Sequence, residues 1–330
     1  MAQAPITILT PAESVFDFDY EVRFPQLDRL YENAKRDQWN VSTTIDWDRP
    51  ISGPPLNMSL MPFCQTELYR SLGAERQDLL GRKFAAWRLS QFLHGEQGAL
   101  MVAAQLVDAV PDLDAKLCAA AQVMDEARHV EAFRKYITKL DRIYPIDPTL
   151  ERLLRAVMEH ERWEPKYTGM QIITEGLAIA AFRFMHAQTG DELLKELLEY
   201  IMKDESRHVG FGMLALRDAV RKLSGPARNS LEEFAFAACD MTITKVENGV
   251  PRDGFLSYHM VFDEMAIPLD QIRLEMNQNP SWKDAEREME KQFNSMLFVD
   301  TLIPCLRQLS LLNDRTEPWY AELGVLSFAA

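Results

Sequence analysis

The chain has little of what several common protein classes require. Its four cysteines, Cys64, Cys118, Cys239 and Cys305, stand far apart and form no Cys-x-x-Cys pair, which excludes a zinc ribbon, a rubredoxin site and a thiol redox motif. No run of apolar residues is long enough to span a membrane. No basic cluster offsets the net charge of −14, so binding to nucleic acid or to an anionic membrane is not expected.

Glycine is also scarce, at 14 of 330 residues, and 16 methionines and 47% hydrophobic residues favour a compact helical protein. The first residues lack the basic and apolar segments of a secretion signal, so we expect a soluble cytoplasmic protein. Residues 1–62 contain seven prolines and predict an irregular arm with one short helix near 26–36. Residues 63–225 then form the bundle core, and 226–330 add helices to the same domain.

Helical periodicity dominates the remainder of the sequence, and no stretch alternates as a strand would. Asp112 is expected to cap the second helix, and Pro165 is expected to end the third. The fold class predicted is therefore all-α. The expected helices cover residues 74–110, 112–140, 149–163, 167–188, 191–223, 231–248 and 282–312.

One pattern of charged residues occurs twice. MDEARHV and KDESRHV each contain Asp-Glu-x-Arg-His, and a further glutamate precedes the Glu of both motifs by the same interval. The offset between the two sets is constant, which indicates an internal repeat of two helical hairpins. The residues concerned are Glu96, Glu126 and His129 in the first half and Glu175, Glu205 and His208 in the second.

All six of these residues fall on the apolar stripe of their expected helices, so four carboxylates are predicted to meet in one core. Burying them without counter-charge would cost several kcal/mol each. Two divalent cations would neutralise them, and oxygen and imidazole donors suit Fe or Mn. One Glu from each of two helices, plus Glu-x-x-His from each of two others, is the pattern of di-iron and di-manganese bundles.

Other residues near the motifs are candidates for supporting roles. Asp125 and Asp204 are placed to orient the histidine of the opposite hairpin, and Arg128 and Arg207 to neutralise them. Gln122 and Gln171, each four residues before a ligand Glu, are candidates for hydrogen bonds to a carboxylate or to metal-bound water. Five apolar residues within two turns of the ligands are expected to wall a substrate pocket: Phe92, Phe133, Ile179, Phe182 and Ile201.

At the DEARH and DESRH motifs the sequence resembles the ferritin-like di-iron carboxylate oxygenases, especially the catalytic subunit of bacterial multicomponent monooxygenases. The resemblance implies a ferritin-like four-helix bundle with additional flanking helices. It assigns Glu96, Glu126 and His129 to one iron and the other three ligands to the second, with Glu126 and Glu205 bridging as the catalytic carboxylates. The chain is also similar to the p-aminobenzoate N-oxygenases, which carry a further His where Ile201 stands; this difference counts against N-oxygenation of that type.

The expected function is that of an O2-activating di-iron monooxygenase acting on a small apolar or aromatic compound, with Mn or mixed Mn/Fe as alternative metals. Its electrons would come from a separate reductase or ferredoxin, because the sequence has no flavin fingerprint and no cysteine cluster. A homodimer is expected. Two alternatives remain open: a ferroxidase or other iron-handling protein, and a radical-generating or ligand-binding oxidase resembling the ribonucleotide reductase small subunit.

Overall fold

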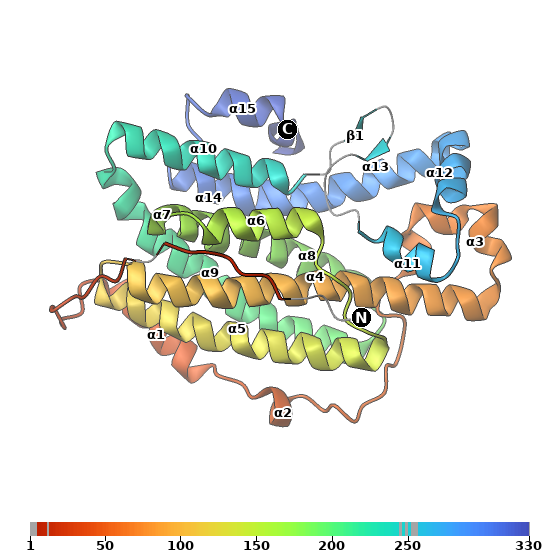
Figure 1. Cartoon of the computed structure of the whole chain (residues 1–330), viewed down its shortest axis with the longest axis horizontal. Coiled ribbons are helices and arrows are strands. Elements are labelled where there is room, and N and C mark those ends of the chain that lie inside the picture. The colour runs from red at the N-terminus through yellow and green to blue at the C-terminus, as the bar shows by residue number, and fades with distance from the viewer. Residues whose placement is uncertain (1–4, 12, 244–245, 248–249, 252–256, 330) are drawn as a thin grey trace.

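Four long helices pack side by side at the centre of the molecule. The structure is a computed structural model that describes residues 5–11, 13–243, 246–247, 250–251 and 257–329. Two helical hairpins, which correspond to the two halves of the sequence repeat, make up this bundle (Figure 1). The hairpins consist of α4 (Gly73–Ala109) with α5 (Leu113–Leu140), and α8 (Glu175–Gln188) with α9 (Glu192–Lys222). The all-α prediction is confirmed.

Shorter elements surround the bundle. Before it come α1 (Pro25–Arg36), α2 (Val41–Thr44), η1 (Met58–Leu60), η2 (Pro62–Gln65) and α3 (Glu67–Ser71). The two hairpins are joined by α6 (Pro148–Met158), α7 (Trp163–Tyr167) and the π-helix η3 (Thr168–Thr174). After the bundle come α10 (Gly225–Met241), α11 (His259–Glu264), α12 (Leu269–Gln278), α13 (Pro280–Asn294), the π-helix η4 (Ser295–Leu302), α14 (Ile303–Gln308), α15 (Glu317–Glu322) and η5 (Val325–Ala329).

The observed helices differ from the expected ones in several places; among them, the helix expected over 149–163 ends at Met158, and the one expected over 282–312 is divided among α13, η4 and α14. The helix expected to begin at residue 231 starts at Gly225, because Pro226 fits a first helical turn, and it ends at Met241. The strands β1 (Val246–Glu247) and β2 (Val250–Pro251) follow it as an antiparallel pair that is too short to show an alternating pattern. Residues 244, 245 and 248 of that expected helix lie outside the described residues. Pro165 falls inside α7, whose first turn tolerates it.

Another difference is a π-helix at the start of the helix expected over residues 167–188. In η3 the Thr174 hydroxyl donates to the carbonyl of Gly169, five residues earlier, at 2.7 Å. Glu175 follows immediately as the first residue of α8. π-Turns within helices occur frequently at functional sites, and this one sets the start of a helix that carries a predicted ligand.

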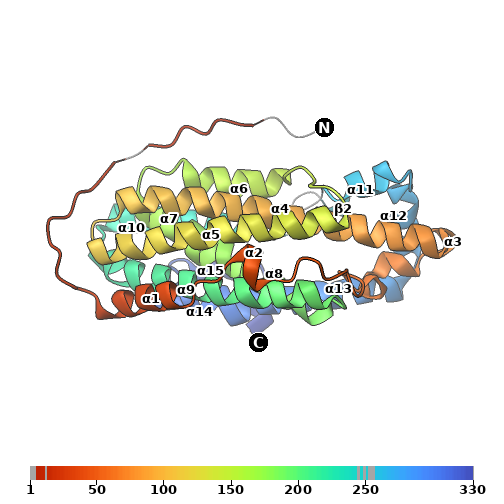
Figure 2. The ribbon, with the colours of Figure 1, turned by 90° about the horizontal axis from the view of Figure 1, so that it is seen from below.

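Aspartate side chains accept hydrogen bonds from backbone N–H groups at the starts of two bundle helices, α5 and α9. Asp112 occupies the N-cap position of α5 but makes no side-chain cap; the Leu113 N–H instead donates to Asp17 of the N-terminal segment. This segment runs around that end of the bundle (Figure 2). Asp191 caps α9 by accepting from Leu194 N–H.

The arm before α3 is anchored at the turn between α8 and α9. Ser52 N–H donates to the Asp191 carboxylate at 2.8 Å, and Gly190 N–H donates to the Pro54 carbonyl at 3.0 Å. Gly53 approaches this turn so closely that a Cβ atom there would lie 2.4 Å from the Gly190 carbonyl oxygen. Glycine is therefore required at position 53 for the arm to reach the bundle.

Apolar side chains from both hairpins and from the surrounding helices fill the interior in two large clusters, one toward each end of the bundle. Buried charged side chains lie between them. In the described part of the chain, no helix is long and apolar enough to cross a membrane.

Candidate metal centre

The six residues predicted as metal ligands meet at the centre of the bundle. Glu96 comes from α4, Glu126 and His129 from α5, Glu175 from α8, and Glu205 and His208 from α9. Each lies on the inward face of its helix and is at most 5% exposed. The helical spacing of three residues places each His beside the Glu of its motif.

Ligand atoms of these residues form two overlapping groups, each suited to one metal ion. The first group is Glu96, Glu126, His129 and Glu205, and the second is Glu126, Glu175, Glu205 and His208. Within each group the ligand atoms lie within 4.8 Å of one another. Glu126 and Glu205 belong to both groups, as expected for carboxylates that bridge two ions. The donor set of oxygen and imidazole nitrogen fits iron or manganese.

Each histidine is oriented by an aspartate from the other hairpin. His129 Nε2 lies 3.1 Å from Asp204 Oδ2, and His208 Nε2 lies 3.1 Å from Asp125 Oδ2. The Nδ1 atoms therefore face the carboxylates; that of His129 is 3.2 Å from Glu96 Oε2. This is the arrangement in which a carboxylate fixes the ring so that its other nitrogen can bind a metal.

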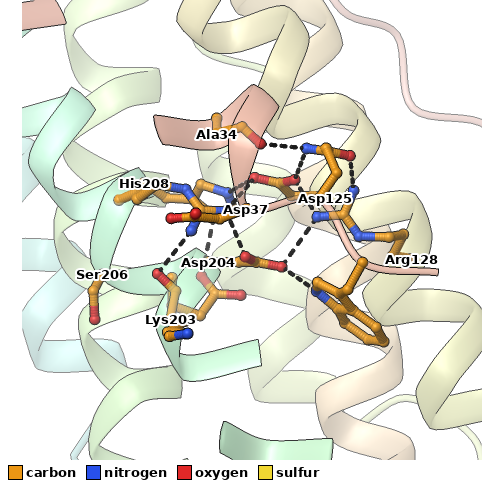
Figure 3. Close-up of polar contacts among 12 residues, drawn as sticks. Ala34, Asp37, Asp125, Arg128, Lys203, Asp204, Ser206 and His208 are labelled. Atoms are coloured by element: carbon orange, nitrogen blue, oxygen red, sulfur yellow. Dashed lines mark hydrogen bonds and ion pairs between the residues drawn. The ribbon is translucent and has the colours of Figure 1, made fainter. Parts of the chain in front are cut away.

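Two arginines pair with these aspartates across the hairpins, and Figure 3 shows Arg128 beside Asp125 and Asp204. Arg128 pairs with Asp125 on its own helix and with Asp204 at 3.2 Å. Arg207 pairs with Asp204 on its own helix and with Asp125 at 3.3 Å. All four side chains are buried, so the predicted contacts form a closed network.

Two residues of the arm complete this network, and the sequence analysis did not identify them. Trp39 Nε1 donates to Asp204 Oδ2 at 2.8 Å, and the Gln38 amide contacts both Asp125 and Arg128. Because they lie far before their partners in the chain, no helical spacing could have linked them.

The carboxylates and imidazoles perturb one another strongly. Burial, followed by the charge of Glu205, raises the pKa of Glu96 well above its usual range, and burial also raises that of Glu175. Burial opposes the charge of Glu126, yet the nearby histidines hold its pKa well below the usual range. Burial likewise opposes the charge of His129, but Glu96 and other acids raise its pKa. The site thus favours positive charge at the imidazole Nδ1 atoms, which a divalent ion would supply in place of a proton.

Three carboxylate oxygens supply the clearest test of whether metal ions fit here. Glu126 Oε2, Glu175 Oε2 and Glu205 Oε1 are buried and accept no hydrogen bond, although His129 Nδ1 lies within ion-pair distance of Glu126 Oε2 at 3.3 Å and of Glu205 Oε1 at 3.0 Å. Buried acceptors without partners are costly and uncommon in proteins. Metal ions between the two histidines would satisfy all three, so the residues present fit a pair of divalent ions.

A glutamine pair holds one side of this cluster. Gln122 Nε2 donates to Glu126 Oε1 at 3.0 Å and to Glu175 Oε1 at 2.5 Å. Gln171 Nε2 donates to Gln122 Oε1 at 3.1 Å. The contacts expected for Gln122 with ligand carboxylates are present, whereas Gln171 acts on Gln122 and not on a ligand.

A cavity of about 350 Å³ adjoins the cluster, and Glu96, Glu175 and Glu205 form part of its wall. Most of the remaining lining is apolar and includes Phe92 and Phe182, as predicted.

Three of the residues predicted to wall a substrate pocket are buried but do not line this cavity: Phe133, Ile179 and Ile201. For these three residues the prediction is wrong as far as this cavity is concerned. The Phe133 ring lies against the Phe182 ring and is packed in the core. On α8 it is Ala178 and Ala181 that reach the cavity, and Ile201 packs within the apolar core.

Arg88 is the unexpected member of the cavity wall. Its guanidinium makes no hydrogen bond or ion pair with the residues that the structure describes. Burial lowers the pKa of this group, because the positive charge is desolvated. The cavity therefore combines apolar walls, carboxylates of the central cluster and a guanidinium that has no partner among the described residues.

Comparison with solved structures supports the fold. A point mutant of an R2-like ligand-binding oxidase with anaerobically reconstituted Mn/Fe cofactor aligns with 84% of this chain and 94% of its own, at 19% identity and a TM-score of 0.50. A second mutant of the same type of oxidase aligns over the same fractions at 18% identity and a TM-score of 0.49. The first similarity shows the ferritin-like fold, and at this identity it shows the fold alone. No curated protein matches the chain.

A family model shows to which protein family the chain belongs. The model of AurF, p-aminobenzoate N-oxygenase, matches residues 21–297, which include both hairpins and both Asp-Glu-x-Arg-His motifs. The match extends over well more than half of the chain. The predicted relationship to ferritin-like oxygenases is confirmed, and the chain belongs to the AurF family of p-aminobenzoate N-oxygenases.

Proposed function

We propose that this protein is a non-haem di-iron monooxygenase that oxidises a small organic compound with O2. The observation that carries the proposal is the pair of overlapping groups of three carboxylates and one histidine, open to an adjoining cavity. Glu96 and His129 would belong to one ion, Glu175 and His208 to the other, and Glu126 and Glu205 to both. When bound, the two metals supply the redox chemistry that activates O2. Two Mn ions, or one Mn and one Fe ion, are the alternatives to two Fe ions at this site.

The protein's own residues contribute orientation and exclusion of water. Asp125 and Asp204 fix the two imidazoles, and the arginines keep those aspartates charged in a buried setting. The apolar wall formed by Phe92 and Phe182 keeps the cavity dry beside the carboxylates. Substrate bound there would lie next to Glu96 and Glu205.

The position of Arg88 in the cavity wall favours a substrate that carries an acidic group. A desolvated guanidinium without a partner costs free energy that an anionic ligand would recover. The substrate named in the family's description, p-aminobenzoate, is an aromatic acid of this kind. An aromatic or apolar acid would place its carboxylate at Arg88 and its apolar part against the phenylalanines.

Ile201 bears on the type of oxidation. It is fully buried one turn before Glu205 and offers no ligand atom at the position where the p-aminobenzoate N-oxygenases carry a further histidine. We therefore favour a reaction of the hydroxylase type for this chain. A separate reductase or ferredoxin would supply electrons, and a homodimer is the expected assembly.

O2 consumption by reduced, iron-loaded protein tests the function. We expect slow uptake alone and faster uptake with the right aromatic or apolar acid, accompanied by one oxidised product per O2. The methyl ester of the same acid should be a poor substitute, and Arg88→Met should remove the difference between acid and ester, with Arg88→Lys as the matched control. Oxidation and retention of many Fe(II) ions per chain, with no effect of organic compounds, would instead support iron handling.

A further inference from the structure

The two halves of the internal repeat differ at two pairs of equivalent positions close to the metal centre. Four residues before each ligand glutamate, the repeat pairs Gln122 with Ile201, and Phe92 with Gln171. Both glutamines lie on the same side of the centre, where they form the glutamine pair described above. The equivalent positions of the other side hold only apolar side chains.

On the glutamine side, two carboxylates are held in fixed orientations. Gln122 donates one N–H to Glu126 Oε1 and the other to Glu175 Oε1, and Gln171 fixes the Gln122 amide from behind. The second oxygen of each carboxylate, Oε2, accepts no hydrogen bond; that of Glu126 lies 3.3 Å from His129 Nδ1, and that of Glu175 lies 3.7 Å from His208 Nδ1. Each glutamate is thus turned so that one oxygen is occupied by the amide and the other remains available to a metal ion.

On the opposite side no amide performs this role. The Phe92 ring packs on Phe182, with 4.8 Å between ring centroids, and Ile201 is fully buried in the apolar core. Among the described residues, the Glu96 carboxylate has the His129 imidazole as its one hydrogen-bond partner. Glu96 therefore depends on the metal itself to fix its orientation.

We infer that the glutamine pair makes the two metal positions unequal. The glutamine-side position, built from Glu126, Glu175, Glu205 and His208, takes the first ion and holds it more tightly. The opposite position, built from Glu96, Glu126, His129 and Glu205, takes the second ion and releases it first. The reason is that the glutamine pair orients Glu175, a ligand of this position alone, before the metal arrives, whereas the Glu126 that it also holds is shared by both positions. This inference rests on the proposed dimetal function.

Mn(II) binding without O2 tests the inference, because free Mn(II) is counted directly from its EPR signal and no turnover is involved. Glu96→Ala should retain the glutamine-side position, and Glu175→Ala should retain the opposite one. We expect the ion left in Glu96→Ala to bind about 10 to 100-fold more tightly than the ion left in Glu175→Ala, the range typical of groups that orient ligands.

Gln122→Met assigns the difference to the amide, since the side chains have similar size. Combined with Glu96→Ala it should weaken Mn(II) binding by about 10 to 100-fold. Combined with Glu175→Ala it should weaken binding less, because only the contact of Gln122 with Glu126, which both positions share, is lost. Ile201→Gln, which places an amide at the repeat-equivalent position, should narrow the gap between the two ions bound by the otherwise unaltered chain. Circular dichroism of each variant confirms that the helices are retained.

Equal affinities in the two single-position variants, or equal weakening of both by Gln122→Met, would overturn the inference while leaving the dimetal function intact. An unaltered chain that binds no Mn(II) or only one ion would contradict the proposed function as well. The two failures are therefore distinguished by the number of ions bound before any substitution is made.

Discussion

His129 and Asp204 lie 75 residues apart on different hairpins, yet the imidazole Nε2 and the carboxylate Oδ2 are 3.1 Å from each other. The same relationship joins His208 to Asp125 in the reverse direction. Each hairpin thus supplies a metal-facing histidine and also the aspartate that orients the histidine of its partner hairpin.

Asp125→Asn and Asp204→Asn should each weaken metal binding by about 10 to 100-fold while keeping the helical content, because an amide orients the histidine less firmly and leaves the arginines without full counter-charge. Mn(II) titration with circular dichroism measures both effects. Asp263→Asn, a change outside the network, is the control. Unaltered affinity in both buried variants would show that the aspartates do not support the histidines.

Metal loading should stabilise the folded protein. The unaltered chain should bind two ions, and Glu96→Ala or Glu175→Ala should bind one. Each ion should raise the free energy of unfolding by about 2.7 kcal/mol when free metal is about 100 times its Kd, since the unfolded chain lacks the site. Urea unfolding with and without Mn(II) measures this. A full stabilising effect in the variant lacking both glutamates would contradict the assignment of these ligands.

The cavity wall allows a matched test of substrate selection. Phe182→Ala should change which compounds accelerate O2 use, because this side chain lines the cavity. Ile179→Ala, three residues earlier on α8, is buried but does not line it and should leave the order of preferred compounds unchanged. Both variants should still bind two ions. Identical changes in the two variants would argue against this cavity as the substrate site.

Tyr136 connects α5 to the start of α9. Its hydroxyl donates to Asp191 Oδ2 at 2.6 Å, and both side chains are fully buried. Tyr136→Phe should lower the free energy of unfolding by about 2 kcal/mol, the range for a buried hydrogen bond to a carboxylate. Tyr20→Phe, at an exposed position, serves as the control for urea unfolding. A loss no larger than that of the control would show that the other donors to Asp191, two backbone N–H groups and the Ser52 hydroxyl, satisfy its carboxylate.

Lys166 should make stability depend on pH in the alkaline range. It is 2% exposed, and burial lowers its pKa to about 8 from an ordinary value of 10.5. Between these values the folded protein has lost a proton that the unfolded chain keeps, so this residue makes the free energy of unfolding rise with pH. In Lys166→Met that contribution should be missing. Urea unfolding of both proteins from pH 7.5 to 10 measures the difference in slope, and equal slopes would contradict the prediction.

The metal centre was predictable from sequence because its geometry is local and repeated. Glu126 and His129 are fixed by one helical turn, and the constant offset of the repeat carries the same relationship to Glu205 and His208. The contribution of Trp39 was not predictable, because an irregular arm brings it to Asp204 through tertiary packing alone. Arg88 was missed for a related reason: its lack of a partner becomes visible only when the whole cavity wall is assembled.

The π-helix before Glu175 could not be predicted either, since hydrophobic periodicity does not distinguish one widened turn from an α-helix. That turn changes the rotational position of α8 relative to the residues before it. Within α8, Ala178 reaches the cavity and Ile179 does not; because residues three and four positions after Glu175 lie on the same helical face, the spacing could not choose between them.

The crossed pairing of aspartates and histidines has a consequence for how such a protein can be built. A single hairpin with the Asp-Glu-x-Arg-His motif leaves its own aspartate without a histidine to orient and its own histidine without an aspartate. Two identical hairpins related by a twofold axis would satisfy both requirements at once. The present chain meets both requirements within a single chain, and its two halves differ where the repeat pairs Gln122 with Ile201 and Phe92 with Gln171.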